Sequence, residues 1–332
     1  MPAPTPDTAI QRPDLGALVY EYLETGPAMG YIGMEVMPTF PVMEQTAGYS
    51  VMPQEALLKI FDTKRAMRGT YNRSDYEFEN GFYATSENGW EEAVDDRERK
   101  LYANAFDADV VAVKRAVNHV LRGQEKRIAD KVFNATNFTA NSITHEWDDA
   151  DNAVPLEDIE TGKLSVRSAC GMVPNTLIIA YSTFLNLRRS AQLIAQFGQN
   201  FAGQDANRMT VSQLAGLLDI EKLLVGGAIY DSAKKGQSAS IADLWSNEYA
   251  MLTVTSSSPD LTVPCIGRTF MWTEDSPGIS TTEQYREEPR RSDIFRVRHD
   301  TDEAFIQSKD EDGTAKSTIY KSVSYLMDNI TT

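Results

Sequence analysis

The sequence predicts an α+β protein built around one long helix, and three observations lead to this class. Residues 107–134 repeat apolar side chains in steps of three and four, which is the pattern of one helical face. Residues 173–268 alternate short apolar runs with amphipathic segments, which indicates an α/β module with its own core. Residues 269–332 are polar and strand-like, so we expect them to return and form a sheet beside the long helix.

Length and composition limit the class of protein. The chain has 332 residues, of which 42% are hydrophobic, enough for one large domain or two smaller ones. A net charge of −16 disfavours general nucleic-acid binding, because such binding needs a basic surface that displaces counterions. No apolar run reaches the length of about 18 residues that a membrane helix needs, and no secretory signal opens the chain. Two cysteines, Cys170 and Cys265, predict reduced thiols, with a bridge between them left open.

The first 54 residues read as an extended arm. Prolines punctuate this segment and exclude any sustained helix. It is too apolar for a disordered tail, yet an extended arm cannot form a core of its own. We therefore expect it to lie against the body of its own subunit or against a neighbouring subunit. The candidate contact residues are apolar: Tyr31, Ile32, Met34, Val36 and Phe40.

Residues 55–93 predict an exposed hairpin loop with a local basic cluster. Alternation at 76–79 indicates a strand, and Asn80-Gly81 is a two-residue turn signal. Several glutamates follow and would repel phosphate, so we expect the cluster to meet an acidic patch on a neighbouring subunit instead of nucleic acid. The cluster consists of Lys59, Lys64, Arg65, Arg68 and Arg73.

The remaining elements follow from local signals. Asp107 is a candidate N-cap for the long helix, and a second helix is expected from Pro155 to Gly171. In the α/β module we expect buried strands at 176–180, 223–229 and 249–254. One helix is expected from Ser182 through Ile194, and a shorter one after Thr210. The closing segment predicts strands at 293–298 and 303–308.

No constellation of catalytic quality is present. His119, His145 and His299 lack the spacing of a zinc site, and Cys170 lacks any local signature of a thiol protease. Gly226-Gly227 follows a strand but lacks the spacing of a dinucleotide-binding loop, so close strand packing explains it better. We predict no catalytic residue, no cofactor and no metal site, and therefore no enzyme.

The order of these blocks resembles the major capsid proteins of tailed bacteriophages, which share the fold named after phage Hong Kong 97. Four segments carry the resemblance, which covers nearly the whole chain: Arg65–Ser74, Val94–Glu98, Pro174–Ile179 and Arg291–Val297. It implies an N-terminal arm (1–54), an E-loop (55–93), a peripheral domain (94–172) with spine helix 107–134, an axial domain (173–268), and returning peripheral strands with a C-terminal segment (269–332).

The resemblance implies a function and partners as well. Many copies are expected to form hexamers and pentamers of an icosahedral shell that encloses double-stranded DNA without sequence-specific binding. A portal is an expected partner, as are scaffolding or decoration proteins. The protein would belong to the virion and assemble in the cytoplasm of the bacterial host, without a membrane. Two alternatives stay open: an encapsulin-like nanocompartment with a protein cargo, and a hydrolase that uses Cys170 or a histidine.

Overall fold

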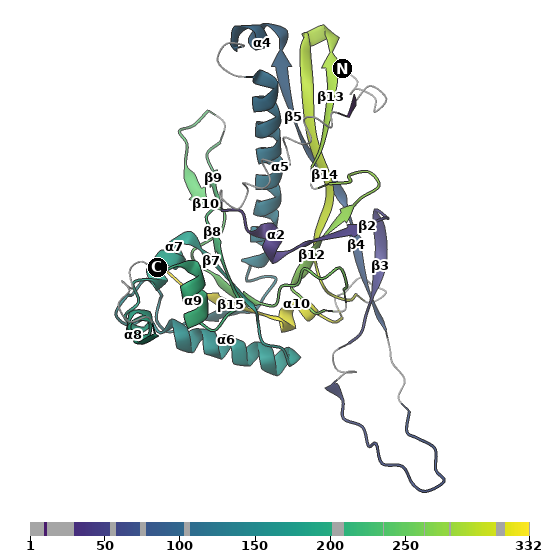
Figure 1. The fold of residues 1–332 in the computed structure, drawn as a ribbon, viewed down its shortest axis with the longest axis vertical. Coiled ribbons are helices and arrows are strands. Elements are labelled where there is room, and N and C mark those ends of the chain that lie inside the picture. The colour runs from purple at the N-terminus through teal and green to yellow at the C-terminus, as the bar shows by residue number, and fades with distance from the viewer. Residues whose placement is uncertain are drawn as a thin grey trace.

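The computed structural model describes residues 10–11, 30–53, 58–73, 78–102, 107–200, 209–234, 236–261, 263–278, 280–309 and 316–331. Figure 1 shows an elongated molecule whose upper part contains one long helix and a long sheet. A second sheet with its helices forms the lower part, and a loop projects away at the lower right. These elements confirm the predicted α+β class.

The helix predicted over 107–134 is α5, Ala108–Val132. Asp107 caps it, because its carboxylate accepts a hydrogen bond of 3.0 Å from the backbone N–H of Asp109. One face of α5 packs on strands β5 (Ser86–Asp95) and β14 (Ser292–Phe305). The core between helix and strands is apolar and contains Val94, Val113, Ala116, Val117, Val120, Leu121, Phe295 and Val297.

The upper sheet is organised by β14, which confirms that the closing segment returns to the long helix. The first half of β14 lies between β5 and β13 (Thr281–Glu287), and its second half pairs with β12 (Gly267–Trp272). From the arm, β2 (Thr39–Val42) adds to β12 in parallel. The short strand β1 (Ile10–Gln11) pairs with β13.

The lower sheet has five strands in the order β6-β15-β11-β7-β8. Their bounds are Ala140–Ser142, Ser324–Asp328, Ala250–Thr253, Thr176–Ala180 and Lys222–Gly226. On one face lie α6 (Pro155–Cys170), α7 (Tyr181–Leu187), α8 (Ala191–Asn200) and α9 (Val211–Leu217). The C-terminal end of α5 covers the other face. Three elements outside 173–268 thus belong to this part of the molecule: β6 and β15 are strands of the sheet, and α6 packs on it. The domain boundaries stay a prediction.

Smaller elements complete the fold. The arm contains α2 (Gly33–Val36), and α4 (Asp96–Tyr102) lies at the top of the molecule. Strands β3 (Thr46–Val51) and β4 (Glu79–Ala84) form a hairpin from which the projecting loop extends. A second hairpin joins β9 (Ile229–Asp231) and β10 (Ile241–Asp243). A 3₁₀ turn, Glu288–Arg290, and α10 (Ile319–Ser322) complete the described elements.

The predicted turn at Asn80-Gly81 is wrong, because both residues lie inside β4. Gly81 pairs with Tyr49 of β3. A Cβ at this position would overlap the Tyr49 ring and approach the Gln307 carbonyl oxygen to 2.6 Å. The glycine therefore permits close packing of a side chain over the strand, and it makes no turn.

Two boundaries in the α/β module also differ from the prediction. The helix expected from Ser182 through Ile194 is two helices, because the chain turns after Leu187 and the Ala191 N–H donates to the carbonyl of Ala150. The strand expected over 223–229 ends at Gly226. There the Gly227 N–H donates to the carbonyl of Gly30 in the arm. The predicted helix after Thr210 is confirmed, with a complete capping box.

Candidate inter-subunit surfaces

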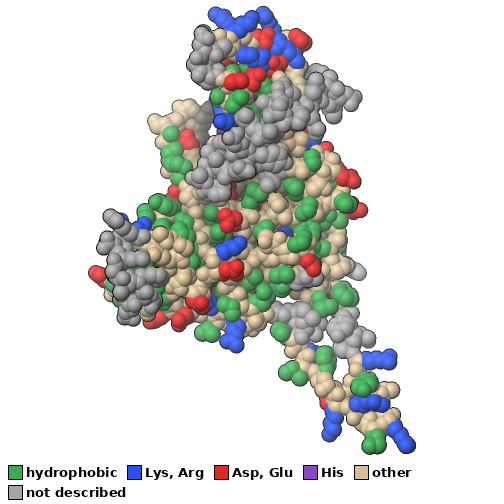
Figure 2. Space-filling model, in the orientation of Figure 1, with side chains coloured by type: hydrophobic (Ala, Val, Ile, Leu, Met, Phe, Trp, Pro, Cys, Tyr) green, Lys and Arg blue, Asp and Glu red, His purple; other side chains and the backbone are tan. Residues whose placement is uncertain are grey.

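The projecting loop, residues 58–73, holds every member of the predicted basic cluster. It extends from the β3–β4 hairpin into solvent, and its blue and green side chains lie clear of the body in Figure 2. Ile60 and Met67 are each 96% exposed. Asp62 is the single carboxylate of this loop, against five cations. None of the five cations forms an ion pair with a carboxylate of the described residues.

Local hydrogen bonds give the projecting loop a defined shape. The Asn72 side chain donates to the Asp62 carbonyl at 2.8 Å and ties the two limbs together. Near the tip, the Arg65 Nε donates to the Gly69 carbonyl at 2.7 Å, and the guanidinium lies 4.7 Å from the centre of the Tyr71 ring. Arg68 has a φ of 64°, so the tip turns through a left-handed residue.

The arm residues lie mainly on their own subunit, the first of the two expected positions. Val36 is fully buried and Ile32 is 7% exposed, both against the lower half of α5. The Tyr31 hydroxyl donates to Asn118 of α5 at 2.8 Å. Phe40 packs edge-on against Phe270 of β12, and Met34 is half-buried.

Glu125 of α5 holds the arm in place. One carboxylate oxygen accepts hydrogen bonds from the Ile32 N–H at 2.8 Å and the Trp245 Nε1–H at 2.7 Å. The other accepts from the Gly33 N–H at 2.8 Å. Burial raises the pKa of Glu125, and the hydrogen bonds partly offset this rise. The sequence analysis did not single out Glu125. A signal was present, because the steps of three and four from Leu121 to Ile128 place a charged residue, Glu125, where the helical pattern predicts an apolar one.

A second charged surface lies on the face of the upper sheet that is turned away from α5. We call it the outer platform; it consists of Glu87, Gly89, Glu91, Glu283, Arg296 and Arg298. The Arg296 Nε donates to Glu91 at 2.7 Å, and a second nitrogen donates to Glu283 at 3.2 Å. Arg298 donates to Glu283 at 3.0 Å and pairs with Asp275. In the sequence, Arg296 and Arg298 alternate with Phe295 and Val297, which are buried. This alternation predicts the face of the sheet on which the arginines lie, but it does not predict the carboxylates with which they pair.

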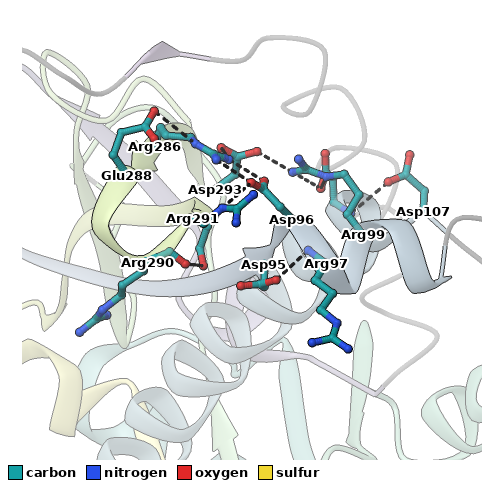
Figure 3. Close-up of polar contacts among 12 residues, drawn as sticks. Asp95, Asp96, Arg97, Arg99, Asp107, Arg286, Glu288, Arg290, Arg291 and Asp293 are labelled. Atoms are coloured by element: carbon teal, nitrogen blue, oxygen red, sulfur yellow. Dashed lines mark hydrogen bonds and ion pairs between the residues drawn. The ribbon is translucent and has the colours of Figure 1, made fainter.

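The top of the molecule carries an ion-pair network, shown in Figure 3. Arg286 of β13 donates to Asp96 at 2.7 and 2.8 Å and to Asp293 at 3.1 Å. Arg99 of α4 bridges Asp293 and Asp109. The hydrogen bond from Arg286 lowers the pKa of Asp96 to about 2. The network fixes the start of α5 to the strands beside it, and the side chain of Arg97 points away from it.

The environments of the cysteines and histidines do not favour nucleophilic catalysis. Both cysteines are free. The Cys170 thiol donates to the Val166 carbonyl at 3.2 Å, and burial raises its pKa, which disfavours the reactive thiolate. His119 packs against Trp90 with ring centres 4.7 Å apart, and buried His299 lies 3.2 Å from Arg127. Within the described ranges, no helix is both long and apolar enough to cross a membrane.

Two curated phage proteins resemble this chain in sequence. The major capsid protein of Burkholderia phage BcepMu is 28% identical over 232 residues, which are 67% of this chain and 72% of that protein. The major capsid protein of Pseudomonas phage JBD67 is 24% identical over 220 residues, 64% of this chain and 69% of that protein. No protein-family model matches. Because both relatives are phage capsid proteins, the nanocompartment alternative is not favoured.

Solved structures share the fold over almost the whole chain. A phage-related protein from Bordetella bronchiseptica RB50 has a TM-score of 0.66 at 20% identity, covering 97% of this chain and 98% of its own. For a putative prophage capsid protein of E. coli CFT073 the TM-score is 0.53 at 10% identity, with 96% and 99% covered. The virus-like particle of Pyrococcus furiosus gives 0.54 at 9%, with 95% and 98% covered. The chain thus has the capsid fold of the Hong Kong 97 type, and its sequence is similar to phage major capsid proteins over about two thirds of its length.

Proposed function

We propose that many copies of this chain assemble into hexamers and pentamers, which close into an icosahedral head shell around double-stranded DNA. The projecting loop is the observation that carries this proposal. Its cations have no carboxylate partner in the described part of their own chain, and Ile60 and Met67 are almost fully exposed. An exposed loop of this kind does not stabilise a monomer. Burial of the loop against another subunit removes apolar surface from water and pairs the charges of the loop.

We propose that the five cations of the loop, Lys59, Lys64, Arg65, Arg68 and Arg73, contact a neighbouring subunit. For the arm, Ile32 and Val36 are already buried in their own subunit. The proposed contact of the arm is therefore restricted to the half-exposed Tyr31, Met34 and Phe40. The five segments named above, from the arm at 1–54 to the closing segment at 269–332, remain our proposed division of the chain.

The negative net charge of the chain supports a shell that encloses DNA without binding it tightly. A net charge of −16 repels phosphate on average, so packaged DNA would touch the shell weakly and without sequence preference. We further propose assembly in the cytoplasm of the bacterial host, a portal at one vertex, scaffolding or decoration proteins as additional partners, and no enzymatic activity.

Electron microscopy of the purified protein beside size-exclusion chromatography tests the proposed function. Closed shells, or rings of five and six subunits, are the expected result. Nuclease-protected DNA in shells isolated from infected cells would support the phage function, whereas a co-purifying cargo protein would support a nanocompartment. A monomer that stays unassembled even with the scaffolding protein would contradict the proposal.

The reversal of Arg65→Glu and Arg68→Glu addresses the role of the loop. These side chains make no contact with the subunit body, so the monomer should fold and unfold like the wild type. Assembly should be blocked, because the loop would repel the acidic surface it is expected to meet. Normal shells from this double variant would count against the loop as an assembly element.

A further inference from the structure

A cavity of about 610 Å³ opens between the β3–β4 hairpin and the lower part of the body. One wall comes from the end of β3 and from residues at the base of the projecting loop. The other wall comes from the C-terminal end of α6, the chain around Leu261, and α10. The volume lies in the range of roughly 300–1,000 Å³ that is typical of binding sites for small molecules.

Most of the side chains that line this cavity are apolar. Val51, Ile306 and Val323 are buried and form its floor. Leu58 and Phe78 form its rim, and they are 62% and 63% exposed. Water in such a space finds few hydrogen-bond partners, whereas an apolar ligand would remove its own surface and that of the lining from water. The cavity therefore fits the apolar body of a small molecule.

The charge at the rim limits the class of ligand. Asp260 is exposed and carries the only formal charge among the described residues that line the cavity. Because this charge is negative, it would repel a ligand with a carboxylate or phosphate group. An ammonium group would be attracted to Asp260 and would stay partly in water, as the charged end of a lysine does at a protein surface. The exposed Phe78 ring offers the same ammonium group a cation–π contact.

From these features we infer that the cavity binds a small amphiphilic amine. The alkyl or aryl body of the ligand would occupy the apolar interior, and its protonated amine would lie at the rim beside Asp260. A bound ligand would also connect the base of the projecting loop to α6 and α10, because it would contact both walls. The inference goes beyond the proposed function and does not depend on it, since the unassembled subunit contains the whole cavity.

Titration calorimetry of the soluble subunit with decylamine, below the concentration at which this amine forms micelles, tests the inference. Decanol and decanoate carry an alkyl chain of the same length without the positive charge. Decylamine should bind at least about tenfold more tightly than decanoate. Asp260→Asn should weaken decylamine by about fivefold or more and leave decanol unchanged. Equal affinities of the wild type for decylamine and decanoate would overturn the inference.

A variant with a filled cavity tests the location of the site. Ser50 lines the cavity from an exposed position on β3, so Ser50→Trp adds volume there without changing the core. This change should weaken decylamine by about tenfold or more. Thr46→Trp, at an exposed position of the same strand outside the lining, is the matched control and should bind like the wild type. A Ser50→Trp variant with a wild-type unfolding midpoint and a wild-type affinity would contradict the proposed site.

Labelling of the cysteines with N-ethylmaleimide provides a second measurement, on the unaltered protein. Cys170 lines the cavity, whereas Cys265 is 1% exposed and lies outside the lining. Decylamine should slow the modification of Cys170 by about fivefold or more, as measured by mass spectrometry. Cys265 should stay unmodified, which shows that the subunit remains folded. An unchanged rate at Cys170, or modification of Cys265 when the amine is added, would overturn the inference. Both experiments use unassembled subunits, so their outcome is separate from that of shell assembly.

Discussion

The indole Nε1–H of Trp245 donates a 2.7 Å hydrogen bond to the Glu125 carboxylate, and this contact joins the chain after β10 to the middle of α5. The same carboxylate accepts the backbone N–H groups of Ile32 and Gly33 from the arm. One buried side chain therefore connects three segments that are far apart in sequence. The arm is held by a specific polar contact in addition to apolar burial.

Removal of this carboxylate should loosen the arm. Glu125→Ala leaves three buried donors without an acceptor, and we expect a loss of about 2–4 kcal/mol in the free energy of unfolding. Denaturant unfolding of the unassembled subunit measures it. Glu160→Ala, an exposed change on α6, is the control and should stay near the wild-type value. An unchanged unfolding free energy for Glu125→Ala would show that the contact does not stabilise the subunit.

The raised pKa of Glu125 predicts a pH dependence of stability. Burial raises the pKa above its ordinary value of 4.5, so the folded state binds this proton more tightly than the unfolded state. The stabilisation is fully present below pH 4.5 and is lost as the pH rises through the folded-state pKa. The unfolding free energy of the wild type relative to Glu125→Gln should therefore decrease with pH above 4.5. Parallel pH profiles of the two proteins would contradict this assignment.

Gly81 provides a test of packing between β3 and β4. Gly81→Ala places a methyl group against the Tyr49 ring and the Gln307 carbonyl, and we expect a cost of about 1–3 kcal/mol. Gly216→Ala in α9 is the matched control, because nothing lies within 4 Å of its added Cβ. In a helix this change should gain up to about 1 kcal/mol. Equal unfolding midpoints for the two variants would rule out steric crowding at Gly81.

Local signals in the sequence predict much of the fold. Asp107 marks the start of α5, and Thr210 marks the start of α9, because a cap acts through its immediate neighbours. The Asn80-Gly81 turn signal failed because the glycine is required by a residue distant in sequence. The ring of Tyr49, about thirty residues earlier, packs where a Cβ of residue 81 would lie, and a rule for turns considers neighbouring residues only. The break between α7 and α8 likewise depends on a distant carbonyl, that of Ala150.

The candidate surfaces were predictable to different degrees. Charge counting locates the basic cluster on an exposed loop, since cations without nearby carboxylates stay in solvent. The burial of Ile32 and Val36 depends on where α5 lies in the folded subunit. The sequence of the arm carries no information about that position. The outer platform depends on the register between β5 and β14, which places Gly89 opposite Arg298 and Glu91 opposite Arg296. Strand alternation gives the face of a residue, but the pairing register needs the folded sheet.

The exposed apolar side chains of the projecting loop provide a test that distinguishes subunit stability from assembly. Ile60 and Met67 bury almost no surface in the monomer, so Ile60→Ser with Met67→Ser should leave the unfolding midpoint unchanged. Shell yield should fall severalfold, since these side chains are expected to be buried between subunits. Leu164→Ser with Val173→Ser removes apolar side chains that are 64% and 56% exposed on and beside α6, and serves as the control. Light scattering during assembly and thermal unfolding of the soluble subunit provide the two readouts. A lower unfolding midpoint in the Ile60→Ser, Met67→Ser variant would show that these side chains stabilise the fold of the subunit. A wild-type shell yield would show that they are not part of the interface.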